Sequence, residues 1–268
     1  MKPTRFHHSR VCSLRLILSI IMMSTTLTSH AQTAAARKIP PSTLTRGEYA
    51  NGRLREQDAI RRATPILKQR LASKKLALGA PVFIRIFKES RKLEVWLQDP
   101  TEKKFKHFKT WKIAAMSGQL GPKTKEGDRQ APEGFYFVPR SRMKPDSRFH
   151  LAFNLGYPNP YDRVHRRTGN FLMVHGNRVS LGCFAMTDPG IEEIYTLCAS
   201  ALRNGQPFFR VHSFPFRMTP ERMEQAKASP HFAFWENLKQ GYDWFETHGT
   251  PPDVQVRNNV YQFSAASE

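Results

Sequence analysis

Two side chains that could act together as nucleophile and base lie close together in the sequence, at the end of an apolar run. Residues 171–174 are typical of a buried strand that leads into His175 on a glycine turn, and Ser-Leu-Gly-Cys follows at 180–183. A histidine near a cysteine can take the thiol proton and make a weak nucleophile usable at neutral pH. Gly182 lets consecutive backbone N–H groups point at one place, as an oxyanion site requires. The same spacing also fits a core cysteine, Cys183, beside a surface histidine.

The other cysteines allow a second interpretation of Cys183. Cys12 lies in a predicted targeting segment, and Cys198 is the third cysteine of the chain. In an oxidising compartment a Cys183–Cys198 disulfide is the ordinary expectation. However, the apolar spacing over 188–205 predicts a helix that turns Cys198 toward a core. We therefore favour a buried Cys198 and a reactive Cys183, with the disulfide as the alternative.

Residues 1–31 are typical of an export signal. A basic start precedes a short apolar run at 16–23, and small residues stand at Ser29 and Ala31. This run is shorter than the roughly 20 residues that span a bilayer. We expect cleavage after Ala31 and a soluble exported protein in the periplasm, without stable membrane insertion. An uncleaved anchor is the alternative, since Arg15 borders the apolar run.

The charge balance indicates the kind of partner. The chain has 42 Lys and Arg against 22 Asp and Glu, a formal net charge of +20. Such a charge favours nucleic acid, an anionic membrane face, or a cell wall rich in carboxylates and phosphates. Export argues against nucleic acid, and no nucleic-acid-binding motif is present. No H-E-x-x-H or C-x-x-C occurs, so we expect no metal and no cofactor.

Composition and periodicity divide the rest of the chain into four parts. Residues 32–52 are predicted to be a flexible leader, and 53–80 an N-terminal helical segment, kinked or divided at Pro65. The segment 81–212 is predicted to be the main domain. The segment 213–268 is predicted to be a C-terminal helical appendage, whose aromatic stripe packs in a core or, alternatively, covers a substrate groove.

The main domain has the pattern of an α+β fold rich in strands. Alternating and apolar runs predict its strands. The expected strands are 82–87, 93–97, 105–115, 135–138, 171–175 and 207–211. Residues 117–134 are a long Gly-, Pro- and Lys-rich loop, and loops longer than about 15 residues in a compact domain are usually functional or disordered.

The order of these motifs resembles the YkuD-type L,D-transpeptidase catalytic domain, most closely its YafK-like branch. The resemblance rests on residues 121–128, 131–134, 149–159 and 175–189. It covers about 82–211, with weaker likeness through the C-terminal aromatic helix. It implies a cysteine enzyme of the bacterial cell wall, with a β-rich sandwich or barrel core and helices at its edge.

The resemblance also implies roles for single residues. Cys183 matches the nucleophile and His175 the base. Backbone N–H groups around Leu181, Gly182 and Cys183 match the oxyanion site. Ser180 is expected to brace the turn or, alternatively, to donate a proton.

Candidate substrate contacts surround the cysteine motif. They are Asn154, Tyr157, Arg163 and Gly176, although such polar turns often satisfy only their own backbone. His150 and His165 could line the cleft or serve as ordinary surface residues. Arg166 and Arg167 could hold substrate carboxylates, although a charge run is usually a solvated face.

Two departures from the family pattern affect the expected reaction. Only residues 176–182 separate His175 from Cys183, and Ala185 stands where an arginine or asparagine is usual. Members of the YafK-like branch are implied to hydrolyse the amide between diaminopimelate and the C-terminal lysine of the murein lipoprotein. The expected partners are therefore peptidoglycan stem peptides and the murein-bound lipoprotein. Hydrolysis is favoured, with transpeptidation and a non-catalytic wall-binding module as alternatives.

Overall fold

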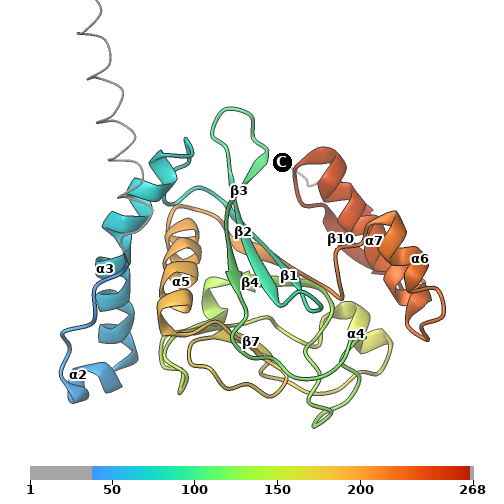
Figure 1. Ribbon diagram of the computed structural model, residues 1–268, viewed down its shortest axis with the longest axis horizontal. Coiled ribbons are helices and arrows are strands. Elements are labelled where there is room, and N and C mark those ends of the chain that lie inside the picture. Colours follow the sequence, from blue (N-terminus) through green and yellow to red (C-terminus); the bar gives the residue numbers. More distant parts are fainter. Residues whose placement is uncertain (1–37, 266–268) are drawn as a thin grey trace, which may run out of the picture. The chain divides into compact units, whose positions relative to one another are not determined.

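A computed structural model describes residues 38–265. The predicted signal segment 1–31 and residues 32–37 of the predicted leader lie outside this range. The described chain forms two sheets and a C-terminal hairpin, with helices packed on both faces of the larger sheet (Figure 1). The expected α+β class is confirmed. Within residues 38–265, no helix is long and apolar enough to cross a membrane.

The larger sheet has five strands in the order β3-β2-β1-β9-β4. The strands are β1 Val82–Phe87, β2 Lys92–Gln98, β3 Phe105–Lys112, β4 Gly134–Pro139 and β9 Phe208–Phe214. β1 pairs antiparallel with β2, as its alternating pattern predicts, and parallel with β9. All six residues of β1 are buried because both faces of this central strand are covered. β9 runs past the predicted boundary at residue 212, so the C-terminal part begins inside the sheet.

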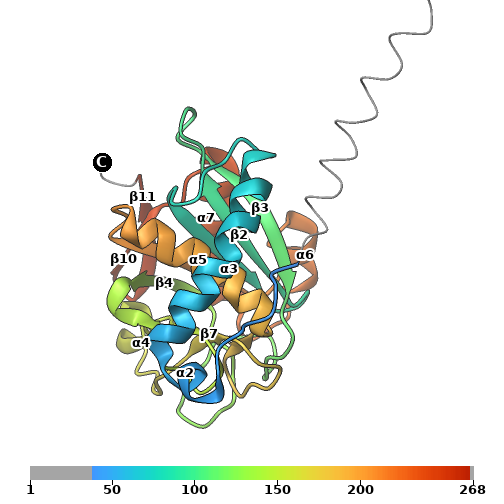
Figure 2. The same ribbon diagram turned by 90° about the vertical axis from the view of Figure 1, so that its left-hand side faces the viewer.

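Two helices, α3 Gly52–Ala72 and α5 Asp188–Arg203, lie over one face of the sheet (Figure 2). The short helix α2 Arg46–Ala50 precedes α3 and packs at its start. α3 is one continuous helix that contains Pro65. Alternate residues of β1, such as Ile84 and Ile86, share a core with the buried faces of α3 and α5.

The prediction of a structureless leader does not hold for Arg46–Ala50. Thr45 and Glu48 form a capping box, in which the Thr45 hydroxyl accepts from the Glu48 N–H and the Glu48 carboxylate accepts from the Thr45 N–H. This pairing satisfies two backbone N–H groups at the start of α2. The short helix has no buried residue, so apolar periodicity gave no signal for it.

The C-terminal part packs on the opposite face of the sheet (Figure 1). It contains α6 Pro220–Gln225, α7 Phe232–His248 and an antiparallel hairpin of β10 Asp253–Arg257 and β11 Val260–Ser264. The hairpin is a correction to the expected all-helical appendage. The aromatic stripe of α7, including Trp235, Tyr242 and Phe245, is buried against phenylalanines of the sheet. The stripe therefore belongs to a core rather than to a lid.

The smaller sheet carries the cysteine motif. Its strands are β5 Met143–Lys144, β6 Ala152–Asn154, β7 Met173–His175 and β8 Phe184–Ala185, in that order. β7 pairs antiparallel with β6 and parallel with β8. A 3-10 turn, η1 Arg140–Arg142, precedes β5, and the short helix α4 Pro160–Val164 follows β6.

Candidate active site

Strand register places Cys183 and His175 on one face of the smaller sheet. Val174 pairs with Phe184 and His175 with Ala185, and Cys183 comes directly before β8. Val174 and Phe184 are fully buried in the main core. Because side chains alternate between the faces of a sheet, His175 and Cys183 both lie on the opposite face. Two neighbouring strands thus bring the two residues together.

The thiol of Cys183 is held by the backbone of the neighbouring strand. The N–H of Met173 donates to Sγ at 3.4 Å, and Sγ lies 3.5 Å from the carbonyl oxygen of Phe171. Cys183 and Cys198 are both free thiols, and Cys198 is buried in the core. In the described chain Sγ makes no hydrogen bond to the His175 ring. Catalytic hydrogen bonds are often long in unliganded enzymes and shorten with substrate.

The orientation of His175 determines which ring nitrogen can act as a base. Nδ1 lies 2.6 Å from the carbonyl oxygen of Gly176. A carbonyl only accepts, so we assign the proton of neutral His175 to Nδ1, which leaves the Nε2 lone pair free. The ring of Phe149 packs against the imidazole with a centroid distance of 4.8 Å.

Burial sets the resting protonation of the pair. It lowers the pKa of His175 below its usual 6.5. Burial likewise raises the pKa of the Cys183 thiol above its usual 9.0, although the Met173 N–H and the Lys123 charge act in the opposite direction. Both shifts favour the neutral forms. The resting pair is therefore a thiol and a neutral imidazole, and the nucleophile forms when the proton moves during attack.

The backbone before Cys183 has an unusual conformation. Gly182 has a φ of +85°, and a Cβ there would lie 3.2 Å from the carbonyl oxygen of Gln130, so this position requires glycine. The Gly182 N–H donates to the hydroxyl of Ser117 at 2.7 Å. The Cys183 N–H makes no hydrogen bond within the described residues. Cys183 thus offers a free backbone donor for an oxyanion, whereas the Gly182 donor is already engaged.

Ser180 braces the turn. Its hydroxyl donates to the carbonyl oxygen of Cys183 at 2.7 Å. This contact closes a short turn around Gly182 and leaves the hydroxyl proton directed at the backbone, away from Sγ. The bracing interpretation of Ser180 fits this geometry.

A cavity of about 410 Å³ opens beside the thiol. Cys183 and Gly182 line it, with the exposed apolar side chains of Phe171 and Leu181. The long loop contributes two basic residues, one acidic residue and a glycine to the lining. These are Lys123, Arg129, Glu126 and Gly127.

The loop 117–134 is ordered and reaches the cysteine turn. Besides accepting from Gly182, the Ser117 hydroxyl donates to the carbonyl oxygen of Arg129 at 2.6 Å. A buried ion pair between Lys88 and Glu133, 2.9 Å apart, anchors the end of the loop. The sequence left open whether this loop is functional or disordered, and no local signal marks Ser117.

Comparison with known proteins shows the family to which this chain belongs. A family model described as the YkuD L,D-transpeptidase catalytic domain matches residues 81–249. The chain belongs to the L,D-transpeptidase family. Escherichia coli K12 YafK, whose name assigns it to these enzymes, is 46% identical over 201 residues, 75% of this chain and 80% of that protein. YafK of strain O157:H7 gives the same values.

Solved structures give weaker likenesses. The helical cell shape determining protein Pgp2 of Campylobacter jejuni has a TM-score of 0.42 and 19% identity, over 76% of this chain and 66% of its own. Bdellovibrio bacteriovorus Bd1075 has a TM-score of 0.38 and 18% identity, over 67% of this chain and 78% of its own.

The L,D-transpeptidase domain uses the predicted substrate residues mainly to hold its own backbone. Asn154 lies on the same face as Cys183, across Met173, but its side-chain Oδ1 accepts from the Gly156 N–H at 2.8 Å. Tyr157 is buried, and its hydroxyl donates to the carbonyl oxygen of Lys123. It therefore supports the loop that carries Lys123.

The remaining candidates lie outside the cavity at Cys183. Arg163 donates to the carbonyl oxygen of Pro158 and lines a separate cavity of about 260 Å³. His165 lies 2.8 Å from the carbonyl oxygen of Asn259, and Arg167 forms an ion pair with a buried aspartate. Arg166 is exposed.

Gly176 acts through the backbone. A Cβ there would lie 2.6 Å from the Asp188 carboxylate and 2.8 Å from the carbonyl oxygen of Phe149. Only glycine fits this space. The Gly176 carbonyl is the acceptor that fixes the His175 tautomer, so its role is to orient the base.

Ala185 occupies the position across from His175. It is fully buried, and its backbone pairs with Ala115 in an isolated bridge. The methyl group adds no charge or hydrogen bond to the catalytic face. Within residues 38–265, no three His, Cys, Asp or Glu side chains form a group that could hold a metal ion.

Proposed function

We propose that this protein is an exported cysteine amidase that acts on peptidoglycan in the periplasm. Its substrate would be the amide between diaminopimelate and the C-terminal lysine of the murein lipoprotein. The observation that supports this most is the position of Cys183. Its thiol opens on a cavity that an exposed arginine, Arg129, helps to line, and it shares a sheet face with His175, in a chain 46% identical to YafK.

The first half of the reaction would acylate the enzyme. As Sγ attacks the amide carbonyl, the thiol proton moves to Nε2 of His175, whose Nδ1–H keeps its hydrogen bond to the Gly176 carbonyl oxygen. The carbonyl oxygen becomes an oxyanion that accepts from the free N–H of Cys183. The C–N bond then breaks, and Nε2 returns its proton to the departing lysine amine. The products are a thioester on Cys183 and free lipoprotein.

The second half would release the peptide. Nε2 of His175 takes a proton from water, and the oxygen attacks the thioester carbonyl. The C–S bond breaks and the proton moves to Sγ, which restores the neutral pair. The released stem peptide carries a free carboxylate.

The cavity walls suit such a substrate. Arg129 is exposed and is placed to attract the carboxylates of a stem peptide, because charge-assisted pairs are the stronger hydrogen bonds. Lys123 is buried and its ammonium pairs with Asp128 at 2.6 Å, so it braces the loop. The exposed side chains of Phe171 and Leu181 offer apolar contact for short aliphatic parts of the peptide.

Ala185 favours water over a second peptide as the acceptor. A transferase must hold the amine of an acceptor peptide beside the thioester, and usual family members have a polar side chain at this position. Here the neighbour of His175 is a buried methyl group. No charged anchor for an acceptor peptide therefore lies on this strand.

Purified protein incubated with lipoprotein-bearing sacculi tests the proposal. Wild-type protein should release lipoprotein, and Cys183→Ala should abolish release while it keeps the melting temperature. Cys198→Ala is the matched control, since it removes the other free thiol from the core. A reactive thiol without any release would refute the amidase. New cross-links from tetrapeptide donors would identify a transpeptidase, and binding without turnover would identify a wall-binding module.

A further inference from the structure

The loop 145–151 connects β5 to β6 and ends beside the catalytic histidine. Its Phe149 ring packs on His175, and Phe149 is 40% exposed on its outer side. The carbonyl oxygen of Leu151 accepts from the Gly176 N–H at 3.0 Å. This loop therefore contacts both the imidazole and the glycine whose carbonyl orients it.

The N-terminal helices hold the first half of this loop. Buried Arg55 of α3 donates to the carbonyl oxygens of Pro145 and Ser147, at 2.5 and 3.1 Å. Its other terminal nitrogen donates to the carbonyl oxygen of Tyr49. Gly52 approaches the backbone of Asp146 so closely that a Cβ would lie 2.7 Å from its Cα. The start of α3 thus fits against the loop.

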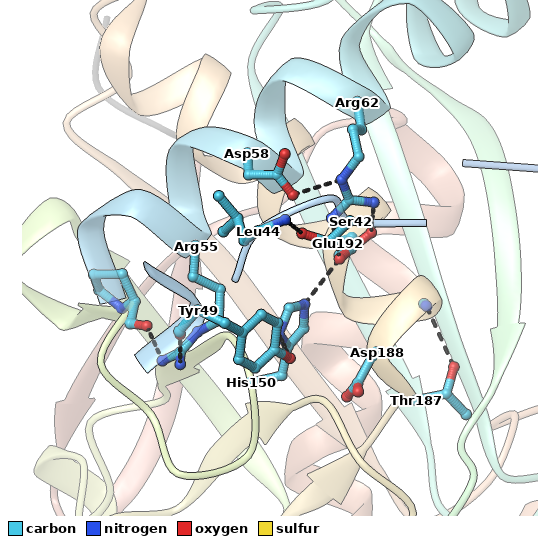
Figure 3. Close-up of polar contacts among 12 residues, drawn as sticks. Ser42, Leu44, Tyr49, Arg55, Asp58, Arg62, His150, Thr187, Asp188 and Glu192 are labelled. Carbon is cyan, nitrogen blue, oxygen red and sulfur yellow. Dashed lines mark hydrogen bonds and ion pairs between the residues drawn. The ribbon is translucent and has the colours of Figure 1, made fainter. Parts of the chain in front are cut away.

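A series of hydrogen bonds and ion pairs holds the second half of the loop 145–151 (Figure 3). The Tyr49 hydroxyl lies 2.6 Å from Nδ1 of His150, and the two rings are stacked at 5.6 Å. Nε2 of His150 lies 2.9 Å from the Glu192 carboxylate, which also pairs with Arg62 at 2.7 Å. Arg62 in turn pairs with Asp58 at 2.7 Å. His150 is thereby fixed between α2, α3 and α5.

His150 needs such support because its backbone is strained. Its φ is +66°, a conformation that non-glycine residues rarely adopt. Strained residues persist where the surrounding contacts fix them, often beside functional sites. Asp188, one turn before Glu192 on α5, accepts from the N–H of Asn177 and holds the turn after His175 from the other side.

We propose that α2 and α3 form a positioning element of the active site, although they lie outside the matched domain. Tyr49 and Arg55 fix the loop 145–151, and Phe149 transmits this placement to the His175 imidazole. These residues do not touch the reacting atoms. The proposal rests on His175 as the base of the proposed reaction, and it predicts that the N-terminal helices set how well this base works.

Tyr49→Phe in the full chain tests the proposal with the least disturbance, since it removes one hydroxyl and keeps the stacked ring. Tyr195→Phe is the matched control. Its hydroxyl also links α5 to α3, through Glu56 at 3.0 Å, but in the described chain it makes no hydrogen bond to the loop 145–151. Phe149→Ala is a second variant, whose outward exposure makes unfolding a minor risk. His175→Asn gives the rate without the base.

Two measurements are needed, because one of them does not depend on the natural substrate. Alkylation of Cys183 by iodoacetamide is followed as a function of pH. Near neutral pH, where the resting thiol is protonated, its rate depends on how well His175 accepts the thiol proton. Release of lipoprotein from sacculi gives kcat and KM. For Tyr49→Phe we expect the rate of alkylation near neutral pH and kcat each to fall by about three- to tenfold, while KM stays unchanged. This range corresponds to the free energy of one hydrogen bond. Phe149→Ala should also lower the alkylation rate and kcat, toward the values of His175→Asn.

Wild-type alkylation rates and pH profiles in both Tyr49→Phe and Phe149→Ala would overturn the positioning role. An equal loss in Tyr195→Phe would also overturn it, because the effect would then be general destabilisation. If wild-type protein releases no lipoprotein, the proposed substrate fails, and the alkylation measurement still decides the positioning role.

Discussion

The buried ion pair under the active-site loop gives the sharpest test of how this site is held. The Lys88 and Glu133 side chains are both 0% exposed. Glu133 also accepts from the Gly121 N–H at 2.7 Å and from the Trp235 indole N–H at 2.9 Å. Lys88 donates to two loop carbonyls as well. The pair therefore joins the sheet, the loop and α7 at one point.

Glu133→Gln keeps the shape of the side chain but leaves the Lys88 charge buried without a counter-charge. Breaking one side of a buried pair costs about 3–5 kcal/mol. For a domain of this size each kcal/mol lowers the melting temperature by about 2–4 °C, so the expected drop is roughly 6–20 °C. Because the Gly121 N–H loses its charged acceptor, the loop that lines the cavity should become more mobile, and KM should rise.

Urea unfolding of the variant, followed by fluorescence, measures the free energy directly. Glu89→Gln is the matched control, because Glu89 is 44% exposed and pairs with Arg222 at 2.7 Å on the surface. It should cost less than about 1 kcal/mol. If Glu133→Gln also stays within about 1 kcal/mol of wild type, the loop is not held by this pair and the reasoning is refuted.

Three further predictions concern the site and the core. Ser117→Ala leaves the Gly182 N–H without its partner, so kcat should fall by about tenfold, and an unchanged initial rate would contradict this role. Cys183 should be alkylated by iodoacetamide with a pH midpoint above 9.0, because its thiol pKa is raised and the His175 pKa is lowered; a midpoint below neutrality would indicate a resting ion pair instead. Both ring nitrogens of buried His212 lack a hydrogen-bond partner in the described chain. His212→Phe removes these unpaired polar atoms, so it should raise the unfolding free energy by about 1–3 kcal/mol. Burial holds the pKa of His212 well below 6.5, so as the pH falls the unfolded chain binds the proton before the folded chain does. Below pH 6.5 the melting temperature of the wild type should therefore drop more steeply with falling pH than that of the variant.

Local patterns predicted much of the fold. The alternating residues at 82–97 give β1 and β2, and the apolar spacing at 188–205 gives α5 with Cys198 buried. Element ends were less certain. The residue before α5, Thr187, is its N-cap, and α7 begins at Phe232, after His231. Such ends depend on single cap contacts, which periodicity does not report.

Two features of the N-terminal and C-terminal parts were missed for different reasons. α2 is too short and too exposed for an apolar pattern, and only the Thr45–Glu48 spacing marks it. The hairpin of β10 and β11 pairs residues around Asn258 and Asn259, both at positive φ, which is ordinary hairpin-turn chemistry. The aromatic stripe of α7 is a helical pattern, so the sequence of this part predicted helices alone.

The sequence by itself determined which chemistry to expect. The types and order of His175, Gly182 and Cys183 predict a cysteine site, since glycine conformation and strand alternation act over a few residues. Only the tertiary structure decided what surrounds them. Ser117, distant in sequence from Gly182, takes its N–H, and Tyr49 supports the loop beside His175. Contacts of this kind depend on how distant segments pack, and burial by that packing also sets the protonation of the pair.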